Sequence, residues 1–222
     1  FNRLSKMDEN IRKKGVVAAS AGNHAQGLAF AAKHFDCEAT IFMPEATPLT
    51  KISGVKSYGA NVVLVGENFD EAYATATKSA LDNDKEFIHP FADDAVIAGQ
   101  GTIALEILEK IEDIEHIIVP IGGGGLISGI AIAAKAINPN IKITGVVASG
   151  ARGMKDSFEA RMPIDSASVK TIADGIAVRD VTPKLLDIIL EYVDQIVEVT
   201  DNETANAILF LLEKHKLVVE GA

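Results

Sequence analysis

The 222-residue chain is long enough to bury a sizeable hydrophobic core, as one large domain or two small ones. Its formal net charge is −10 and it has no block of Lys and Arg, so nucleic acid is not an expected partner. No apolar run reaches the ~18 residues that cross a membrane and no signal peptide opens the chain, so we expect a cytoplasmic protein without a membrane partner.

Cysteine occurs once, at Cys37, which excludes a disulfide framework and a thiol-rich metal site. Because Cys37 leads into an apolar strand, core packing is favoured over a role as a nucleophile.

Apolar runs rich in β-branched residues alternate with helical patterns along most of the chain. The expected strands are residues 15–20, 38–43, 61–66, 116–121, 141–148 and 195–200. Continuously apolar strands separated by helix-length segments indicate parallel sheets covered on both faces. The sequence therefore predicts an α/β fold.

Local signals place several helix ends. These are Asn23 as the cap of the first helix, Pro48 at the start of the next, Asn138 and Pro139 after the helix that follows the glycines, and Thr200 or Asp201 as the last cap, with Glu203 as a capping-box partner. Three strand–helix units end near residue 92, and a second set begins near residue 116. We expect a smaller domain at residues 15–92, and a larger one made of residues 1–14 and 93–222.

Four consecutive glycines stand between two apolar runs, in VPIGGGGLISG at residues 119–129. Glycine costs roughly 0.5–1 kcal/mol inside a regular element, so four together need a reason. A strand, a glycine loop and a helix in succession bring backbone N–H groups and the positive end of the helix to one place. We expect a phosphate site here, with close backbone packing as the alternative.

The common nucleotide-binding patterns do not fit this loop. The dinucleotide fingerprint from Gly122 needs a glycine where Ile127 stands. The Walker A pattern needs Lys and then Ser or Thr after its last glycine, and neither Gly129 nor Gly27 is followed by them. A nucleotide-binding protein is therefore disfavoured.

A second strand-to-helix turn, AASAGNHAQG at residues 18–27, carries polar side chains. Ser20, Asn23 and the N–H groups around Gly22 would suit a carboxylate. The alternatives are a plain helix cap for Asn23 and a satisfied helix histidine for His24. Two anion-binding turns on different sheets imply one ligand with a phosphate at one end and a carboxylate at the other.

The motifs SAGNHAQG, PIGGGGLISG and TIADGIAV (residues 171–178) resemble, in this order, those of the pyridoxal-phosphate enzymes of the tryptophan-synthase-β fold. The chain is most similar to the threonine dehydratase (threonine ammonia-lyase) and serine dehydratase branch, over essentially its whole length. The resemblance implies two three-layer αβα domains with parallel sheets, a cofactor cleft between them, and closure of the smaller domain over substrate. It also implies a small amino-acid substrate and a homodimer or homotetramer.

The resemblance assigns roles to residues of this chain. The expected pyridoxal 5′-phosphate contacts are Asn23, Gly122, Gly123, Gly124, Gly125, Leu126 and Glu220. The expected contacts of the substrate carboxylate are Ser20, Ala21, Gly22, Asn23 and His24.

The implied reaction removes water and ammonia from L-threonine, and from L-serine as a second substrate, to leave a 2-oxo acid. The cofactor ring accepts electrons from the amino acid, and a lysine holds the cofactor as a Schiff base. In the family that lysine directly precedes a stretch like FNRL, so we expect it upstream of Phe1, with no catalytic residue in this segment and an inactive segment of an active parent. Lys6, Lys13 and Lys14 are interpreted as surface residues. The partner of the pyridine nitrogen is expected beyond Ala222.

Some positions depart from related enzymes. Ala21 stands where serine racemases of this fold carry a serine that transfers a proton, which favours elimination. Ser149 and Gly150 stand where related enzymes hold a divalent cation, so no such metal is expected. Two acidic pairs, at 93–94 and 112–113, are interpreted as helix-end charges. Asp174 could orient the glycine loop or lie in a surface turn.

Three alternatives stay open: a serine racemase, another β-eliminating enzyme of this fold, and a catalytically dead relative that only binds ligand. Formation of D-serine from L-serine would identify a serine racemase. Absence of the upstream lysine would identify a catalytically dead relative. Threonine catabolism and isoleucine biosynthesis are both compatible with the resemblance.

Overall fold

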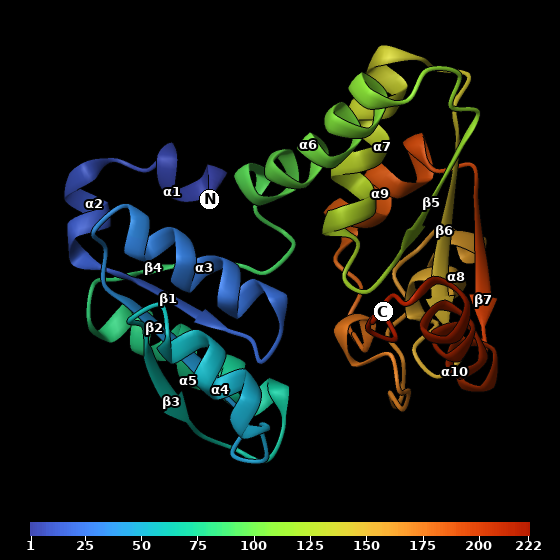
Figure 1. Cartoon of the computed structure of the whole chain (residues 1–222). Helices are drawn as coiled ribbons and strands as arrows, with labels where there is room; N and C mark the ends of the chain where they lie inside the picture. The colour runs from blue at the N-terminus through green and yellow to red at the C-terminus, as the bar shows by residue number, and fades with distance from the viewer. The chain divides into compact units, whose positions relative to one another are not determined.

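The structure, a computed structural model, describes residues 1–222 and divides into two compact units, residues 1–99 and 100–222 (Figure 1). The elements of the first unit are α1 (Asn2–Ser5), α2 (Glu9–Lys14), β1 (Val16–Ala19), α3 (Asn23–His34), β2 (Ala39–Met43), α4 (Leu49–Lys56), β3 (Asn61–Leu64), α5 (Phe69–Asp82) and β4 (Glu86–Phe87). Helix α6 (Asp94–Lys110) runs across the boundary. The second unit contains β5 (His116–Pro120), α7 (Gly125–Ile137), β6 (Lys142–Ala148), α8 (Gly153–Ala160), α9 (Pro183–Tyr192), β7 (Gln195–Val199) and α10 (Asp201–Phe210), with short turns of helix at Asp174–Ile176 and Leu211–His215.

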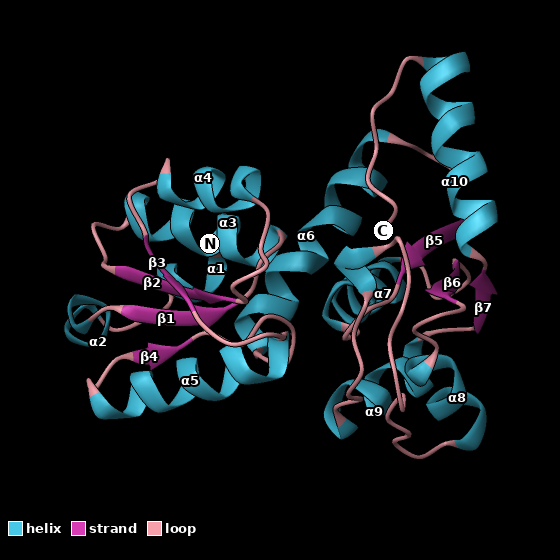
Figure 2. Ribbon diagram, turned by 90° about the horizontal axis from the view of Figure 1, so that it is seen from below, coloured by secondary structure: helices cyan, strands magenta, loops and turns pink.

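The first unit is a parallel sheet in the order β3-β2-β1-β4, between two layers of helix. Helices α3 and α4 lie on one face and α5 on the other, as two perpendicular views show (Figures 1 and 2). Strand β1 is buried on both sides: Val16 and Ala18 belong to the core under α3, while Val17 and Ala19 belong to the core under α5. The alternation of side chains along a strand explains this division.

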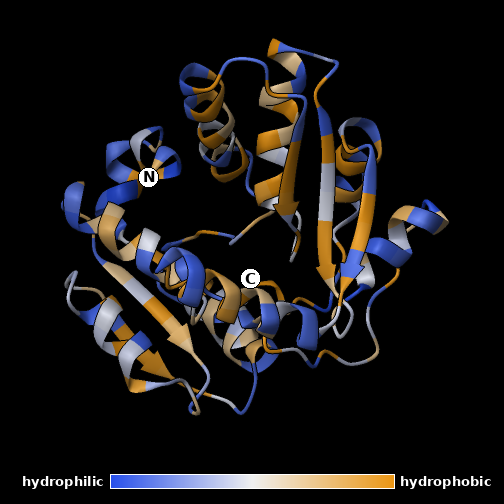
Figure 3. Cartoon of the chain, turned by 45° about the vertical axis from the view of Figure 1, so that its right-hand side comes forward, coloured by the Kyte–Doolittle hydropathy of each residue, from blue (hydrophilic) through white to orange (hydrophobic).

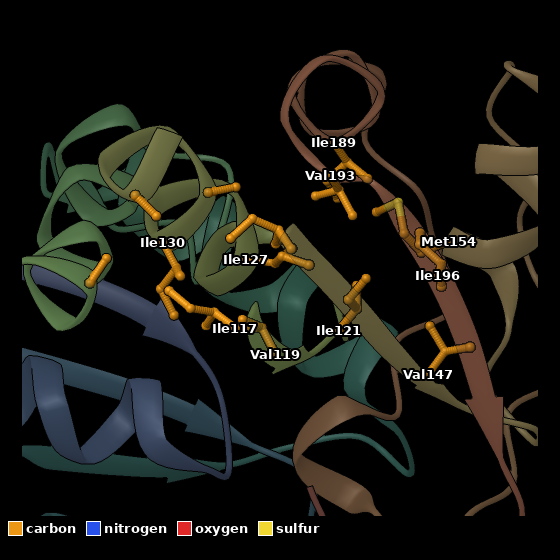
Figure 4. Close-up of a cluster of buried hydrophobic side chains, with 14 of the residues drawn as sticks. Ile117, Val119, Ile121, Ile127, Ile130, Val147, Met154, Ile189, Val193 and Ile196 are labelled. Carbon is orange, nitrogen blue, oxygen red and sulfur yellow. The ribbon is translucent and has the colours of Figure 1, made fainter. Parts of the chain in front are cut away.

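The second unit is a parallel sheet in the order β5-β6-β7. Isoleucines and valines from alternate strand positions meet apolar side chains of α7, α8 and α9 in one core (Figure 4). On the opposite face, Ile118 is 64% exposed and Val197 is 39% exposed. In Figure 3 the apolar residues of both units concentrate on the strands and on one side of the helices.

The two parallel sheets and all six expected strands are confirmed, each within one or two residues of its predicted ends. The capping box of Thr200 with Glu203 and the end of α7 before Asn138 are also confirmed. The prediction for Asn23 is wrong, because Gly22 is the N-cap of α3 and no side chain caps that helix. Asn23 is already the first helical residue, so its side chain is not placed to fold back onto the helix end.

Strand β4 and helices α8 and α9 were not predicted. The domain boundaries stay a prediction, although the division after Gly99 places residues 1–14 in the same compact unit as β1. None of the helices is both long and apolar enough to cross a membrane.

Candidate functional site

The glycine loop connects β5 to α7, as the sequence predicts. Gly124 is the N-cap of α7 and has no side chain to cap the helix. The first N–H groups of an α-helix have no acceptor within the helix, so this end presents uncapped donors together with the positive end of the helix dipole. The intrahelical pattern is established at Ser128, whose N–H donates to Gly124 O at 3.0 Å.

Two of the glycines are required by the protein itself. Gly124 has φ +93°, a left-handed conformation that residues with a Cβ rarely adopt. A Cβ there would also lie 3.0 Å from Ile189 Cδ1 of α9. A Cβ on Gly122 would lie 3.0 Å from Ile176 Cα. The loop thus follows a path that excludes side chains and brings main-chain N–H groups together at the start of α7, which fits a phosphate group.

The segment of residues 170–178, which contains TIADGIAV and is named the strap here, runs past the ends of all three strands of the second sheet. It contacts Gly122 after β5 through Ile176. It meets Gly150 after β6, where the N–H of Lys170 donates to Gly150 O at 3.0 Å and a Cβ on the glycine would overlap Lys170 O. After β7, Asp201 accepts hydrogen bonds from the strap.

The bonds to Asp201 are specific. The Thr171 hydroxyl donates to Asp201 Oδ1 at 2.6 Å, and the Ile172 N–H donates to Oδ2 at 3.3 Å. Asp201 is the first residue of α10, a position where a carboxylate is stabilised by the helix dipole. Asp201 therefore holds the strap at the same edge of the sheet as the glycine loop.

Asp174 and Glu220 lie on or beside the strap. Asp174 is exposed and begins the single 3₁₀ turn of the strap, which favours the surface-turn interpretation over the orienting one. A Cβ on Gly175 would lie 2.9 Å from Ala222 Cβ and 3.9 Å from Glu220 Oε2, so the last residues of the chain pack against the strap. Glu220 itself is exposed, and its predicted contact with the cofactor stays a prediction.

The predicted carboxylate turn lies in the first unit, between β1 and α3. The Ser20 Oγ accepts a hydrogen bond from the Gly22 N–H at 3.2 Å, which leaves the hydroxyl proton available to donate. Helix α3 begins at Asn23 with no side-chain cap, and Gly22 O accepts from the N–H of Ala25 at 3.1 Å. The turn thus presents a hydroxyl and a helix N-terminus at one strand end, as a carboxylate receptor requires.

The side chain of His24 points away from this role. Its Nε2 lies 3.0 Å from the carbonyl oxygen of Ile88, and because a carbonyl only accepts, Nε2 must carry the proton. Burial lowers the pKa of His24 to about 4, so the ring is neutral at pH 7 and Nδ1 has no proton to donate. A carboxylate could therefore be bound by the main-chain N–H of His24 and not by its ring.

The acidic pair at 93–94 acts as expected for helix-end charges. Asp93 Oδ1 accepts from the N–H groups of Ala95 and Val96, at 2.8 and 3.0 Å, at the start of α6. Its other oxygen accepts from Arg3 Nε at 2.7 Å. Sequence reasoning missed His89, which lies four residues before Asp93 and acts electrostatically on His24. Its place between apolar residues and the Asp93 cap, in FIHPFADD, was the available signal.

The remaining candidate nucleophiles and bases are remote from these turns or inert. Lys13 pairs with Glu9 and Lys14 with Asp84 on the surface, as interpreted from the sequence. Burial raises the pKa of the Cys37 thiol, which donates to the Arg12 carbonyl at 3.1 Å, so it is not an activated nucleophile.

Two cavities lie elsewhere in the molecule. One of about 440 Å³ is lined by His116, Lys142 and neighbours at the amino-terminal edge of the second sheet, and one of about 210 Å³ lies between α3 and the loop after α4. Neither includes a residue of the glycine loop or of the carboxylate turn. No three His, Cys, Asp or Glu side chains are grouped as metal ligands, and the expectation of no metal stays a prediction.

Comparison with known proteins places this chain among enzymes. It is 47% identical to an L-threonine ammonia-lyase of Thermotoga maritima, over 100% of this chain and 55% of that protein. It superposes with a TM-score of 0.95 on the processed form of threonine deaminase isoform 2 from Solanum lycopersicum, at 40% identity, covering 99% of this chain and 64% of that one. A maize serine racemase gives the same TM-score at 36% identity, covering 99% and 67%. The chain thus spans little more than half the length of the Thermotoga relative.

The family comparison covers every residue. The family described as pyridoxal-phosphate dependent enzyme matches residues 1–222. Together with the relatives above, this confirms the resemblance, the fold and the cofactor class inferred from the sequence motifs. The chain belongs to the pyridoxal-phosphate-dependent enzyme family.

Proposed function

We propose that this chain carries the phosphate- and carboxylate-binding parts of a lyase that removes water and ammonia from L-threonine, with L-serine as a second substrate. The observation that carries the proposal is the uncapped start of α7 behind Gly124, in a chain 47% identical to a threonine ammonia-lyase. One receptor lies in each unit: the glycine loop in the second, and the turn of residues 20–24 in the first.

When bound, pyridoxal phosphate draws electrons from the amino acid and makes its Cα proton removable. The residues of this chain bind and orient. The amides at the start of α7 hold the phosphate, and the strap fixes the path of the loop through Ile176. The Ser20 hydroxyl and the first amides of α3 hold the carboxylate, while the His24 ring anchors α3 to Ile88, directly after β4. Each receptor restricts the orientation of the group that it binds, which is how such contacts contribute to rate.

Serine racemase is the second candidate, favoured by the similarity to the maize enzyme. Ala21 weighs against it, because a methyl group can neither accept nor donate a proton. The matched test compares the wild type with Ala21→Ser. We expect 2-oxo acid from L-threonine and L-serine with the wild type, without D-serine. D-serine should form only with Ala21→Ser. D-serine as the main wild-type product would refute the lyase proposal in favour of racemisation.

The expectation that a lysine upstream of Phe1 holds the cofactor stays a prediction. Borohydride reduction of residues 1–222 with pyridoxal phosphate, beside a chain extended by about ten residues at its start, tests it. Covalent labelling of the extended chain alone would support the prediction. Labelling of residues 1–222 would refute it, and labelling of neither would favour a relative that only binds ligand.

We further propose a homo-oligomer that acts in the cytoplasm, on the family resemblance alone. Light scattering of the purified protein would test the oligomeric state, and cell fractionation would test the location. A monomer at micromolar concentration would contradict the assembly.

A further inference from the structure

A small network joins the carboxylate turn to the loop that follows β4. The main chain of Ile88 is held at both ends: its N–H donates to Val17 O of β1 at 2.8 Å, and its carbonyl accepts from His24 Nε2 at 3.0 Å. Ile88 is 1% exposed. The orientation of the His24 ring, and with it the first turn of α3, therefore depends on the direction of this one carbonyl.

The next residue, His89, controls the path of the chain beyond that carbonyl. Its Nδ1 accepts from two main-chain N–H groups, those of Phe91 at 3.2 Å and Ala92 at 2.9 Å. An atom that accepts two N–H bonds carries no proton, so the ring must be neutral with its proton on Nε2. Burial lowers the pKa of His89, which agrees with this tautomer at neutral pH.

Aromatic side chains fix the ring itself. The Phe91 ring meets it edge-to-face with 4.6 Å between centroids, and Tyr73 of α5 lies 6.0 Å away. Such edge-to-face contacts favour this orientation of the ring. His89 thus closes a tight turn at residues 89–92, directly before Asp93 caps α6.

We propose that His89 is a positioning residue for the amino-acid carboxylate: its Nδ1 holds the 89–92 turn, which fixes the Ile88 carbonyl, which in turn orients His24 and the start of α3. The inference rests on the proposed function, because it takes the turn of residues 20–24 as the carboxylate receptor. It assigns to His89 no contact with substrate or cofactor.

Two substitutions of similar size separate the roles of the two ring nitrogens. In His89→Asn the side-chain oxygen stands at the position of Nδ1, two bonds from Cβ, and can still accept from both N–H groups. In His89→Gln the amide reaches the position of Nε2 and the acceptor at the Nδ1 position is lost. Both variants are neutral and polar, so Asn is the matched control for Gln.

The first readout is amide hydrogen exchange of Phe91 and Ala92 in the holoenzyme. The second is the affinity for L-serine, measured from the change it causes in the visible absorption of the bound cofactor, which needs no turnover. We expect His89→Gln to exchange both amides at least about tenfold faster and to weaken L-serine binding about tenfold, with little change in cofactor affinity. His89→Asn should stay within about threefold of the wild type in both readouts.

Acidification of the wild type gives a test without substitution, in case His89→Gln does not fold. The ionisable groups around His89 are Tyr73 on α5, His24 on α3 and Asp93, which is paired with Arg3. Protonating Nδ1 removes the acceptor, so L-serine affinity of the wild type should fall on acidification. His89→Asn should lack that fall.

Equal behaviour of the Asn and Gln variants, faster exchange without weaker binding, or the same acid profile in wild type and His89→Asn would each overturn the proposal. Failure of the proposed function has a different signature. In that case L-threonine and L-serine yield no 2-oxo acid, while the spectral titration with L-serine still reports on His89.

Discussion

The buried His24 should make the protein less stable in acid, by an amount that the structure sets. Its folded-state pKa is about 4, against about 6.5 for an unperturbed histidine, and burial is the main cause. The folded protein therefore resists protonation more than the unfolded chain does. The stability from this group is complete above pH 6.5 and is lost as the pH falls towards 4.

The magnitude follows from the difference between the two pKa values. At about 1.4 kcal/mol for each pKa unit, the loss between pH 6.5 and 4 reaches at most about 3 kcal/mol. The partial exposure of the residue as a whole lowers the figure to about 2–3 kcal/mol. That is a large part of the 5–15 kcal/mol by which most proteins are stable.

The assay is urea unfolding of the wild type and of His24→Gln at a series of pH values from 7 to 4. Glutamine can donate from its Nε2 to the Ile88 carbonyl without titrating, so the variant should lose about 2–3 kcal/mol less than the wild type over this range. His34→Gln, an exposed position at the other end of the same helix, is the control and should follow the wild type. Parallel curves for wild type and His24→Gln would refute the neutral, buried ring.

Three further predictions concern stability, each measured by denaturant unfolding. Ser128 is fully buried and its hydroxyl has no hydrogen-bond partner, so Ser128→Ala should raise the free energy of unfolding by about 1 kcal/mol; a decrease would show that the hydroxyl is bonded. Gly150→Ala should lower the free energy of unfolding by about 2 kcal/mol or more, because the added Cβ would overlap Lys170 O. Proteolysis of the strap should also become faster. Unchanged stability would mean that the strap does not pack against Gly150. Thr200→Ala removes the capping box with Glu203 and should lower the free energy of unfolding by about 1 kcal/mol. Thr200→Ser keeps a hydroxyl at this position and should retain most of that stability.

The sequence predicted those parts of the fold in which neighbours along the chain determine the structure. The six strands were visible because each is a short run rich in β-branched apolar residues, and the cap at Thr200 because its partner Glu203 is three residues away. Strand β4 was missed because two residues are too short for a pattern, and it exists through its pairing with β1. Helix α9 carried a usable signal, namely Pro183 at its first position and apolar residues at the spacing of one helical face.

The candidate site could be predicted only to the level of motifs. The glycine loop and the carboxylate turn were visible because a strand, a turn and a helix follow one another directly. The role of the His24 ring was not, because its acceptor on Ile88 is 64 residues away in sequence. His89 was hidden for the same kind of reason: its Nδ1 bonds are local, but their consequence for the turn at residues 20–24 exists only in the folded unit.

Two explanations were given for the glycine loop, phosphate binding and close backbone packing, and they are compatible with each other. Close packing accounts for Gly122 and Gly124, whose missing Cβ atoms make room for Ile176 of the strap and Ile189 of α9. Because the packing comes from protein on the sides of the loop, it keeps the main chain on one path while its N–H groups stay uncapped at the start of α7. A donor array that is already fixed loses little entropy when an anion binds, so tight packing would strengthen the proposed phosphate site. Substitutions in the strap that loosen Ile176 should therefore weaken phosphate binding even though they touch no phosphate.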